Sequence, residues 1–173
     1  MNRIKIIISI LLAFISIGVN AQTDKETTKR IIEAKDFVFI ASSAIPMNSA
    51  EINNILSRMP GGNGGGTISL TGGNYDVRIT PDSLVAYLPY YGRAFSAPMD
   101  RNESGFKFTS TKFSYQNVTR KKGGWQITIN PKDTKENIRM NFSVSQNGYA
   151  SLVVSSNNKQ SINYNGYLAE PKK

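Results

Sequence analysis

The feature that most constrains the fold is an alternation of apolar and polar side chains that recurs along the C-terminal half of the chain. Segment 125–130 reads WQITIN, and segment 138–145 reads IRMNFSVS. Successive side chains on a β-strand point to opposite faces, so each segment predicts a strand with one buried and one wet face. Further alternating segments are 75–80, 106–109, 113–116, 149–155 and 162–165. Strands with one solvent-exposed face do not fit a parallel sheet that is covered on both faces.

Turn residues separate these segments and predict how the strands connect. The pairs Pro81-Asp82, Gly123-Gly124, Asn147-Gly148 and Asn157-Asn158 fit tight reversals. Asn147-Gly148 fits best, because both residues tolerate the positive φ of a type I′ turn. Short strands joined by short turns predict an antiparallel meander. With roughly eight to ten strands, we expect an all-β sheet closed into a barrel or a flattened sandwich, a lipocalin-like barrel being the alternative.

One or two short peripheral helices are expected before the strands. Asp24–Lys35 predicts a helix capped by Thr23 or Asp24, and it leads into the apolar strand Asp36–Ala44. Asn48–Met59 carries apolar residues at i, i+3, i+4 and i+7, which indicates a second helix; a loop with hydrophobic anchors is the alternative. The glycine-rich loop 60–66 lacks the Lys-Ser/Thr of a phosphate-binding loop, so we interpret it as a flexible connection.

The buried phase of the alternation predicts the core. These residues are Val77, Ile79, Trp125, Ile127, Ile129, Met140, Phe142, Val144, Leu152, Val154 and Ile162.

The first 21 residues read as a secretory signal peptide. Arg3 and Lys5 form a positive n-region, and Ile6–Val19 is a 14-residue apolar stretch. Small residues precede the expected cleavage after Ala21, which would leave Gln22 as the first mature residue. An uncleaved membrane anchor is the alternative, but the apolar stretch is short of the roughly 20 residues that span a bilayer. With no cysteine for lipid attachment, a periplasmic or secreted protein is expected.

The mature chain, residues 22–173, is expected to form a single β domain with no membrane-spanning segment. Its size allows a core without disulfides. The net charge is +9 in the full chain, and loss of Arg3 and Lys5 leaves 9 − 2 = +7. Such a protein could meet anionic head groups, acidic glycans or DNA outside the cytoplasm. The only basic run, Arg120-Lys121-Lys122, is best explained as a solvated turn, and we expect no nucleic-acid partner.

Histidine and cysteine are both absent, which excludes most catalytic and metal-binding chemistry. Ser-His-Asp and Cys-His catalysis and structural zinc sites all need these residues. We therefore expect no metal site, no cofactor and no enzymatic activity, unless carboxylates or tyrosines perform the catalysis. The acidic pairs Asp76 with Asp82 and Asp133 with Glu136 give no sign of converging across a cleft.

The densest aromatic cluster is Tyr87–Phe95, which reads YLPYYGRAF. Its candidate binding residues are Tyr87, Tyr90, Tyr91, Arg93 and Phe95. Stacked tyrosines beside an arginine suit a sugar ring or a planar acidic ligand. A tyrosine-rich corner that packs across a barrel end, with its phenols bonded to backbone, is the favoured interpretation.

Five segments form a distinctive series along the chain: 75–95, 106–110, 124–127, 147–152 and 162–167. Together they resemble the exported domain-of-unknown-function family DUF4251 of Gram-negative gut bacteria, and the resemblance covers about Ile31–Leu168. The resemblance implies a periplasmic or secreted location and no established activity, so no catalytic residue is transferred. Gly61–Gly66 looks like an insertion in the family pattern. Asp82-Ser83-Leu84 resembles the O-glycosylation acceptor of such bacteria, which makes Ser83 a candidate for modification.

These observations favour a non-enzymatic binding or interaction module. The expected ligand is a small amphipathic molecule or a glycan, held in a lipocalin-like cavity or on the Tyr87–Phe95 surface. One alternative is a hydrolase that works through carboxylates or tyrosine. Another is a structural partner in a cell-envelope complex, which would use a sheet edge.

Overall fold

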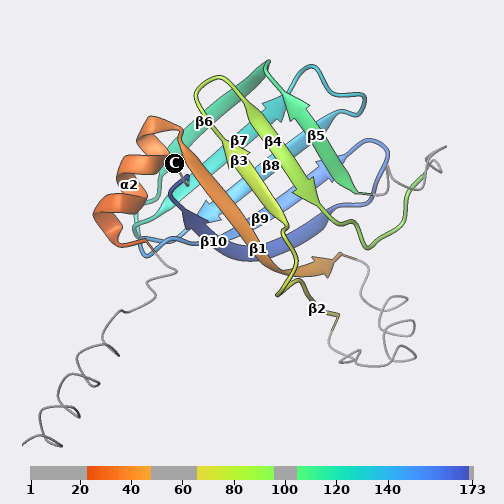
Figure 1. The fold of residues 1–173 in the computed structure, drawn as a ribbon, viewed down its shortest axis with the longest axis horizontal. Coiled ribbons are helices and arrows are strands. Elements are labelled where there is room, and N and C mark those ends of the chain that lie inside the picture. The colour runs from red at the N-terminus through yellow and green to blue at the C-terminus, as the bar shows by residue number, and fades with distance from the viewer. Residues whose placement is uncertain (1–22, 48–65, 96–104, 172–173) are drawn as a thin grey trace, which may run out of the picture.

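The strands form one antiparallel sheet that curls into a flattened, nearly closed barrel with one helix, as the alternation predicts (Figure 1). The computed structural model describes residues 23–47, 66–95 and 105–171. The signal peptide 1–21, the expected helix Asn48–Met59 and nearly all of the loop 60–66 lie outside the described residues. No helix among the described residues is long and apolar enough to cross a membrane.

The described elements begin with the helix α2, Lys25–Ala34, and continue with strands. The strands are β1 (Phe37–Pro46), β2 (Ile68–Ser69), β3 (Asp76–Ile79), β4 (Leu84–Leu88), β5 (Phe106–Ser110), β6 (Phe113–Thr119), β7 (Trp125–Pro131), β8 (Ile138–Val144), β9 (Tyr149–Ser156) and β10 (Ile162–Ala169). Their order in the sheet is β5-β4-β3-β1-β10-β9-β8-β7-β6, with β2 paired to β1.

The predicted meander holds for β3–β5 and for β6–β10, but two connections differ from it. Strand β1 inserts between β3 and β10 and so joins the two meanders. Strands β5 and β6 are consecutive in the chain, yet the sheet order leaves them at its two ends. Instead, β6 contacts the helix: the Tyr115 hydroxyl donates to the Ile32 carbonyl at 3.1 Å. The barrel is therefore open between β5 and β6.

A bulge bends β1 at Ser42, where the register with β10 shifts. Beyond this residue β1 changes its second neighbour from β3 to β2. Gly166 on β10 faces the bend, and a Cβ there would lie 1.9 Å from the Ile40 carbonyl oxygen. The close approach of the two backbones thus requires glycine at this position.

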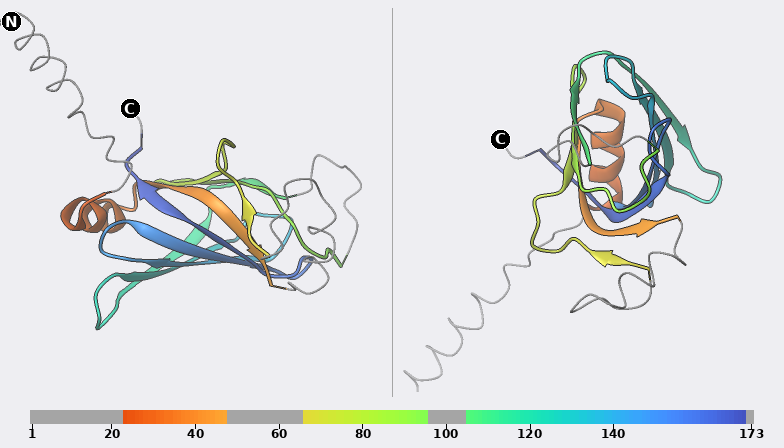
Figure 2. Two further views of the ribbon diagram at one scale, coloured as in Figure 1. Left: turned by 90° about the horizontal axis from the view of Figure 1, so that it is seen from below. Right: turned by 90° about the vertical axis from the view of Figure 1, so that its right-hand side faces the viewer.

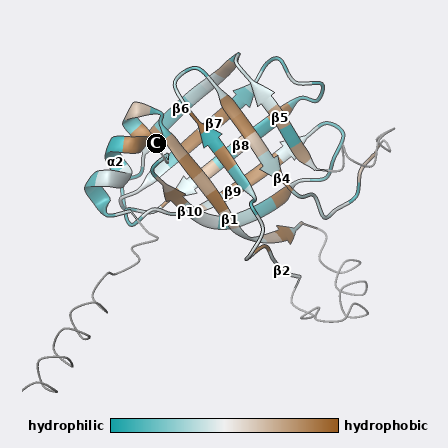
Figure 3. Ribbon diagram, in the orientation of Figure 1, coloured by the Kyte–Doolittle hydropathy of each residue, from teal (hydrophilic) through white to brown (hydrophobic). Residues whose placement is uncertain are grey.

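The barrel interior is filled by side chains from opposite walls. Phe37 and Phe39 of β1 meet Phe142 of β8 edge to face, with ring centroids 6.3 and 5.6 Å apart. All eleven residues predicted for the core are buried, and the apolar bands alternate with polar ones along the strands (Figure 3). The core also takes in Leu84, Leu88, Phe106 and Tyr164. This packing occupies the space in which a lipocalin-like barrel would hold its ligand.

Helix α2 lies across one end of the barrel (Figure 2). Its buried residues Thr28, Ile31 and Ile32 face the core. Asp24 caps the helix by accepting from the Thr27 backbone N–H at 2.8 Å, and this bond holds the pKa of Asp24 below its usual value. The alternative cap, Thr23, bonds the Thr28 hydroxyl instead.

The predicted type I′ turn at Asn147-Gly148 is wrong in its geometry. Ser145 donates its N–H to the Tyr149 carbonyl, and Gly148 donates to the Ser145 carbonyl. Of the turn residues, only Gly148 has a positive φ, at 79°. The reversal is thus a three-residue loop over residues 146–148, in which a left-handed glycine lets Asn147 keep an ordinary conformation.

We predict that Phe142→Ala lowers the free energy of unfolding by about 3–5 kcal/mol, because it empties the contact between the two walls. Val118→Ala is the matched control, since Val118 is 63% exposed and its truncation should stay within about 0.5 kcal/mol. Urea denaturation measures both values. Equal losses would show that the interior is loosely filled.

Candidate functional site

The predicted Tyr87–Phe95 segment divides between a half-buried corner and the outer face of the barrel. At the barrel end opposite α2, the Tyr90 hydroxyl lies 2.7 Å from the Arg93 carbonyl oxygen and 3.1 Å from that of Gln160. The Tyr164 hydroxyl donates to the Pro89 carbonyl at 2.6 Å. Burial raises the pKa of both phenols. These bonds match the expected tyrosine-rich corner.

The corner is tied to the sheet by a nearly buried ion pair. Lys159 is 6% exposed and its ammonium bonds the Glu136 carboxylate. Ser156 donates to the same carboxylate at 2.7 Å, and the ammonium lies 5.3 Å from the centre of the Phe106 ring. Burial alone would raise the pKa of Glu136, but the bonds from Lys159 and Ser156 outweigh it and hold the pKa below its usual value. This ion pair thus holds the corner against the sheet at this end of the barrel.

Short backbone pairing completes this attachment. Ala94 pairs with Lys159 in an isolated antiparallel bridge. Phe95 donates its N–H to the Asn158 carbonyl at 2.8 Å, and Gln160 donates to the Arg93 carbonyl at 3.0 Å. The Phe95 ring itself is 68% exposed, whereas Tyr91 is half-buried and burial raises its pKa. A ligand-binding role for these residues stays a prediction.

The acidic residues each contact a different structural partner. Asp76 pairs with Arg78 at 2.8 Å. Asp133 binds the β5–β6 turn: it accepts from the Ser110 hydroxyl and from the N–H groups of Thr111 and Lys112, and these bonds lower the pKa of Asp133 to about 2. Within the described parts of the chain, no group of three or more acidic residues could hold a metal ion.

Ser83 lies in the β3–β4 turn, where its hydroxyl is 2.8 Å from that of Thr80. The neighbouring Pro81 and Asp82 are exposed, but Ser83 itself is half-buried. Modification of Ser83 stays a prediction, and it would replace this hydroxyl–hydroxyl contact.

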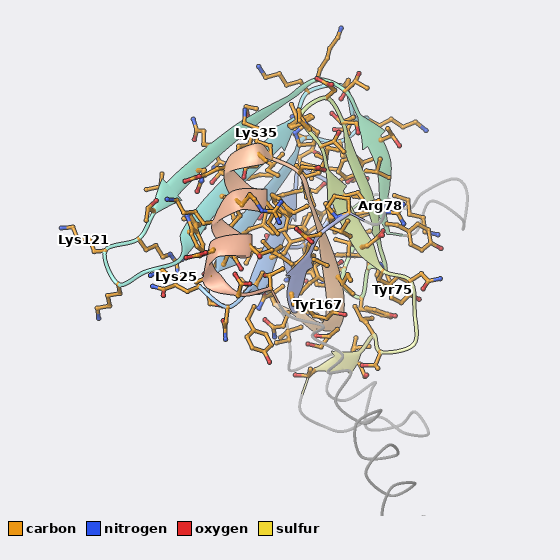
Figure 4. The ribbon with its side chains drawn as sticks, turned by 60° about the vertical axis from the view of Figure 1, so that its left-hand side comes forward. Lys25, Lys35, Tyr75, Arg78, Lys121 and Tyr167 are labelled. Carbon is orange, nitrogen blue, oxygen red and sulfur yellow. The ribbon has the colours of Figure 1, made fainter. Side chains whose placement is uncertain are left out.

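The structure assembles an outward row that the sequence did not reveal. Strand registers align the outward residues Tyr149, Tyr167, Ile40, Asp76, Tyr87 and Lys107 across six strands, from β9 to β5. Tyr75 joins this row, because its ring stacks on Tyr87 with centroids 6.0 Å apart and planes 11° apart. Tyr149 and Tyr87 are 48% and 44% exposed. Figure 4 shows Tyr167 and Tyr75 on one side of the molecule.

We name the residues Tyr149, Tyr167, Ile40, Tyr75 and Tyr87 the tyrosine row. The row crosses the five strands from β9 to β4, and with strands about 4.8 Å apart it extends over about 19 Å of curved surface. The Lys107 ammonium lies 5.0 Å from the centre of the Tyr87 ring at one end. The row thus combines aromatic rings, phenol hydroxyls and a cation on a face where polar side chains are expected.

An open groove adjoins the row at Tyr149. It has a volume of about 400 Å³, and its side chains include Arg120, Ser143, Ser145, Tyr149, Ser151 and Asn165. Ser151 donates to the neighbouring Asn163 at 2.7 Å, which fixes the hydroxyl within a ladder of polar side chains. The groove therefore offers hydroxyl and amide groups, one guanidinium and one aromatic ring on a surface that is more apolar than polar.

Known proteins identify the family of this barrel. The family model described as "Domain of unknown function (DUF4251)" matches residues 20–168. The chain belongs to the DUF4251 family. Among solved structures, the crystal structure of a DUF4251 family protein from Bacteroides eggerthii DSM 20697 is similar, with a TM-score of 0.56. The two chains share 14% sequence identity over 84% of this chain and 87% of that one.

The comparison confirms the family resemblance and shows the fold, but it names no activity. Among curated proteins, none matches the chain. The function of this DUF4251 protein must therefore be argued from its own surface. A sequence signal for part of that surface existed: Tyr149 and Tyr167 fall in the polar phase of their strands, where an aromatic residue is out of place.

We predict that Lys159→Met lowers the free energy of unfolding by about 1–3 kcal/mol, because it leaves the Glu136 carboxylate without its charged partner. Glu136→Gln should act similarly by leaving the buried ammonium unpaired. The double variant should lose less than the sum of the two. Thermal denaturation of the wild type, the two single variants and the double variant measures the coupling between Lys159 and Glu136. Strictly additive losses would contradict the role of the pair.

We predict that Asp133 makes stability depend on pH at the acidic end of the range. The folded-state pKa lies below the ordinary value of 3.8, so its contribution is present above that value and is lost as pH falls toward about 2. Denaturation midpoints of the wild type and Asp133→Asn, measured between pH 7 and pH 2, should converge as pH falls. A constant difference would contradict this assignment.

Proposed function

We propose that this DUF4251 protein is a non-enzymatic binding module that holds a glycan along the tyrosine row. One observation carries the proposal: tyrosines from four separate segments align on the outer face and lead into a groove whose mainly apolar surface carries hydroxyl and amide groups. A sugar ring presents C–H groups that pack on aromatic rings and hydroxyls that bond to side chains such as Ser151 and Asn165. Tyrosine supplies both kinds of contact with little loss of side-chain entropy.

The packed interior favours this outer site over an internal one. An amphipathic ligand inside the barrel would have to displace the contacts of Phe142 with Phe37 and Phe39. Helix α2 and the tyrosine-rich corner also lie across the two ends. The row and the groove need no such rearrangement to receive a ligand.

The contacts of the acidic residues also favour binding over hydrolysis. Asp76, Asp133 and Glu136 are engaged by Arg78, by the β5–β6 turn and by Lys159, respectively. A glycosidase needs two carboxylates facing each other across the scissile bond. No described residue pair with that arrangement adjoins the row or the groove.

The charge along the row suits a neutral or weakly acidic glycan. Lys107 lies at one end of the row, and Arg120 lines the groove at the other end. A linear chain of several sugar rings could reach both cations. The location remains part of the proposal: cleavage of the leader at Ala21 would release the protein to the periplasm or the exterior, where such glycans occur.

We predict that linear tetra- to hexasaccharides of cellulose, xylan or hyaluronan bind the mature chain, measured by isothermal titration calorimetry. The variant Tyr87→Ala with Tyr149→Ala should weaken binding at least tenfold, because it removes a ring from each end of the row. Phe95→Ala is the matched control, since it removes an exposed aromatic ring outside the row. Unchanged affinity of the row variant, or the same loss in the control, would contradict the proposal, as would failure of all three glycans to bind.

A further inference from the structure

The edge strand β6 offers a second interaction surface, which shares Arg120 with the groove. Among the described residues, β6 pairs with β7 on one side and with no strand on the other. Its neighbour in the chain, β5, pairs with β4 instead. The β6–β7 hairpin projects from the body of the barrel, so the edge is reachable from solvent (Figure 2).

Two backbone bonds show which groups of β6 face this open edge. Lys132 donates its N–H to the Lys112 carbonyl at 2.7 Å, and Arg120 donates to the Gly124 carbonyl at 3.0 Å. Bonded pairs in an antiparallel ladder recur at every second residue, so the even-numbered residues of β6 bond to β7. The backbone groups of Phe113, Tyr115, Asn117 and Thr119 therefore point toward the open edge.

Pro131 supports this assignment. It lies directly opposite Phe113 in the register of β6 and β7. Proline has no N–H, so it fits only where the ladder needs none. Phe113 and Pro131 thus form a non-bonded pair. The backbone N–H and C=O groups of the odd-numbered residues of β6 therefore point away from β7, toward the open edge.

Apart from the contact of Tyr115 with helix α2, strand β6 lacks the features by which proteins usually protect a sheet edge. Its sequence FSYQNVT holds no charged residue and no proline, and it is seven residues long. Its last four residues are exposed, including Val118. An edge that is long, uncharged and partly apolar is a template for another strand.

The charges around the edge indicate what kind of strand fits. Arg120, Lys121 and Lys122 follow β6, and Lys112 precedes it. Figure 4 shows Lys121 at the tip of the hairpin, with Lys25 of α2 on the same side. Asp133 binds the turn beside Lys112, so the stronger positive charge lies at the far end of β6. Antiparallel pairing would bring the N-terminal end of an added strand to this basic end.

We propose that β6 binds an extended segment of a partner protein, antiparallel, with acidic residues at its N-terminal end and uncharged β-forming residues after them. A second copy of this chain fits less well. Antiparallel pairing of two β6 strands about Gln116 would set Arg120 of each copy opposite Lys112 of the other, and like charges directly opposite are destabilising. Main-chain bonds supply the affinity in this mode of binding, and the flanking charges orient the segment.

The test uses a fluorescent peptide, acetyl-EEETVTVTVT-amide, and the mature chain in an anisotropy titration. The wild type and Asn117→Ala should bind it with equal affinity. Asn117→Pro should weaken binding at least tenfold, because it removes an N–H that faces the open edge and leaves the bonds to β7 intact. A peptide with lysine in place of the three glutamates should also bind at least tenfold more weakly.

A second measurement keeps the test independent of how Asn117→Pro folds. N-methylation of alternate peptide residues, in both phases, removes the donors of one peptide edge at a time. The peptide methylated on the residues that face β6 should lose binding to the wild type. The peptide methylated on the other residues should keep it. Equal binding of both, or no binding of the glutamate peptide, overturns the proposal. A wild-type dimer that Asn117→Pro dissociates would assign the edge to a second copy and also overturn it.

Discussion

The structure depends on contact between opposite walls of the barrel through three aromatic rings. Phe142 of β8 meets Phe37 and Phe39 of β1, although β9 and β10 separate these strands in the sheet. Such contact requires the sheet to curl and flatten, and it leaves little room for a ligand. Burial of each ring contributes a large apolar area. A ligand inside the barrel would have to displace these ring contacts, which favours a site on the outer face.

Closure of the two barrel ends uses different chemistry at each end. At one end, α2 buries Ile31 and Ile32 and receives the Tyr115 hydroxyl on the Ile32 carbonyl. At the other, Tyr90 and Tyr164 satisfy backbone carbonyls and Lys159 meets Glu136. The polar groups at both ends are thereby paired, as burial requires. The tyrosine row lies outside both closures, whereas β6 takes part in the closure at α2 through Tyr115.

The sequence predicted the local features well because they depend on neighbouring residues. The alternation placed every predicted core residue, including Trp125 and Leu152, on the buried face. It could not show that β1 lies between β3 and β10, since that pairing joins residues far apart in the chain. The same limit hid the tyrosine row: Tyr87 and Tyr149 belong to one surface only through the registers of three intervening strands, β3, β1 and β10. The pairing of Lys159 with Glu136 was hidden for the same reason.

The most direct test of the filled barrel with an outer site is amide chemical-shift mapping on the isotope-labelled mature chain. Separate titrations would add a xylohexaose and a medium-chain fatty acid. The account predicts that xylohexaose perturbs outward positions around Tyr149 and Tyr167, while the fatty acid leaves Phe142 and Leu152 unchanged. Saturable changes at Phe142 and Leu152 with the fatty acid, together with none along the row with the sugar, would contradict it.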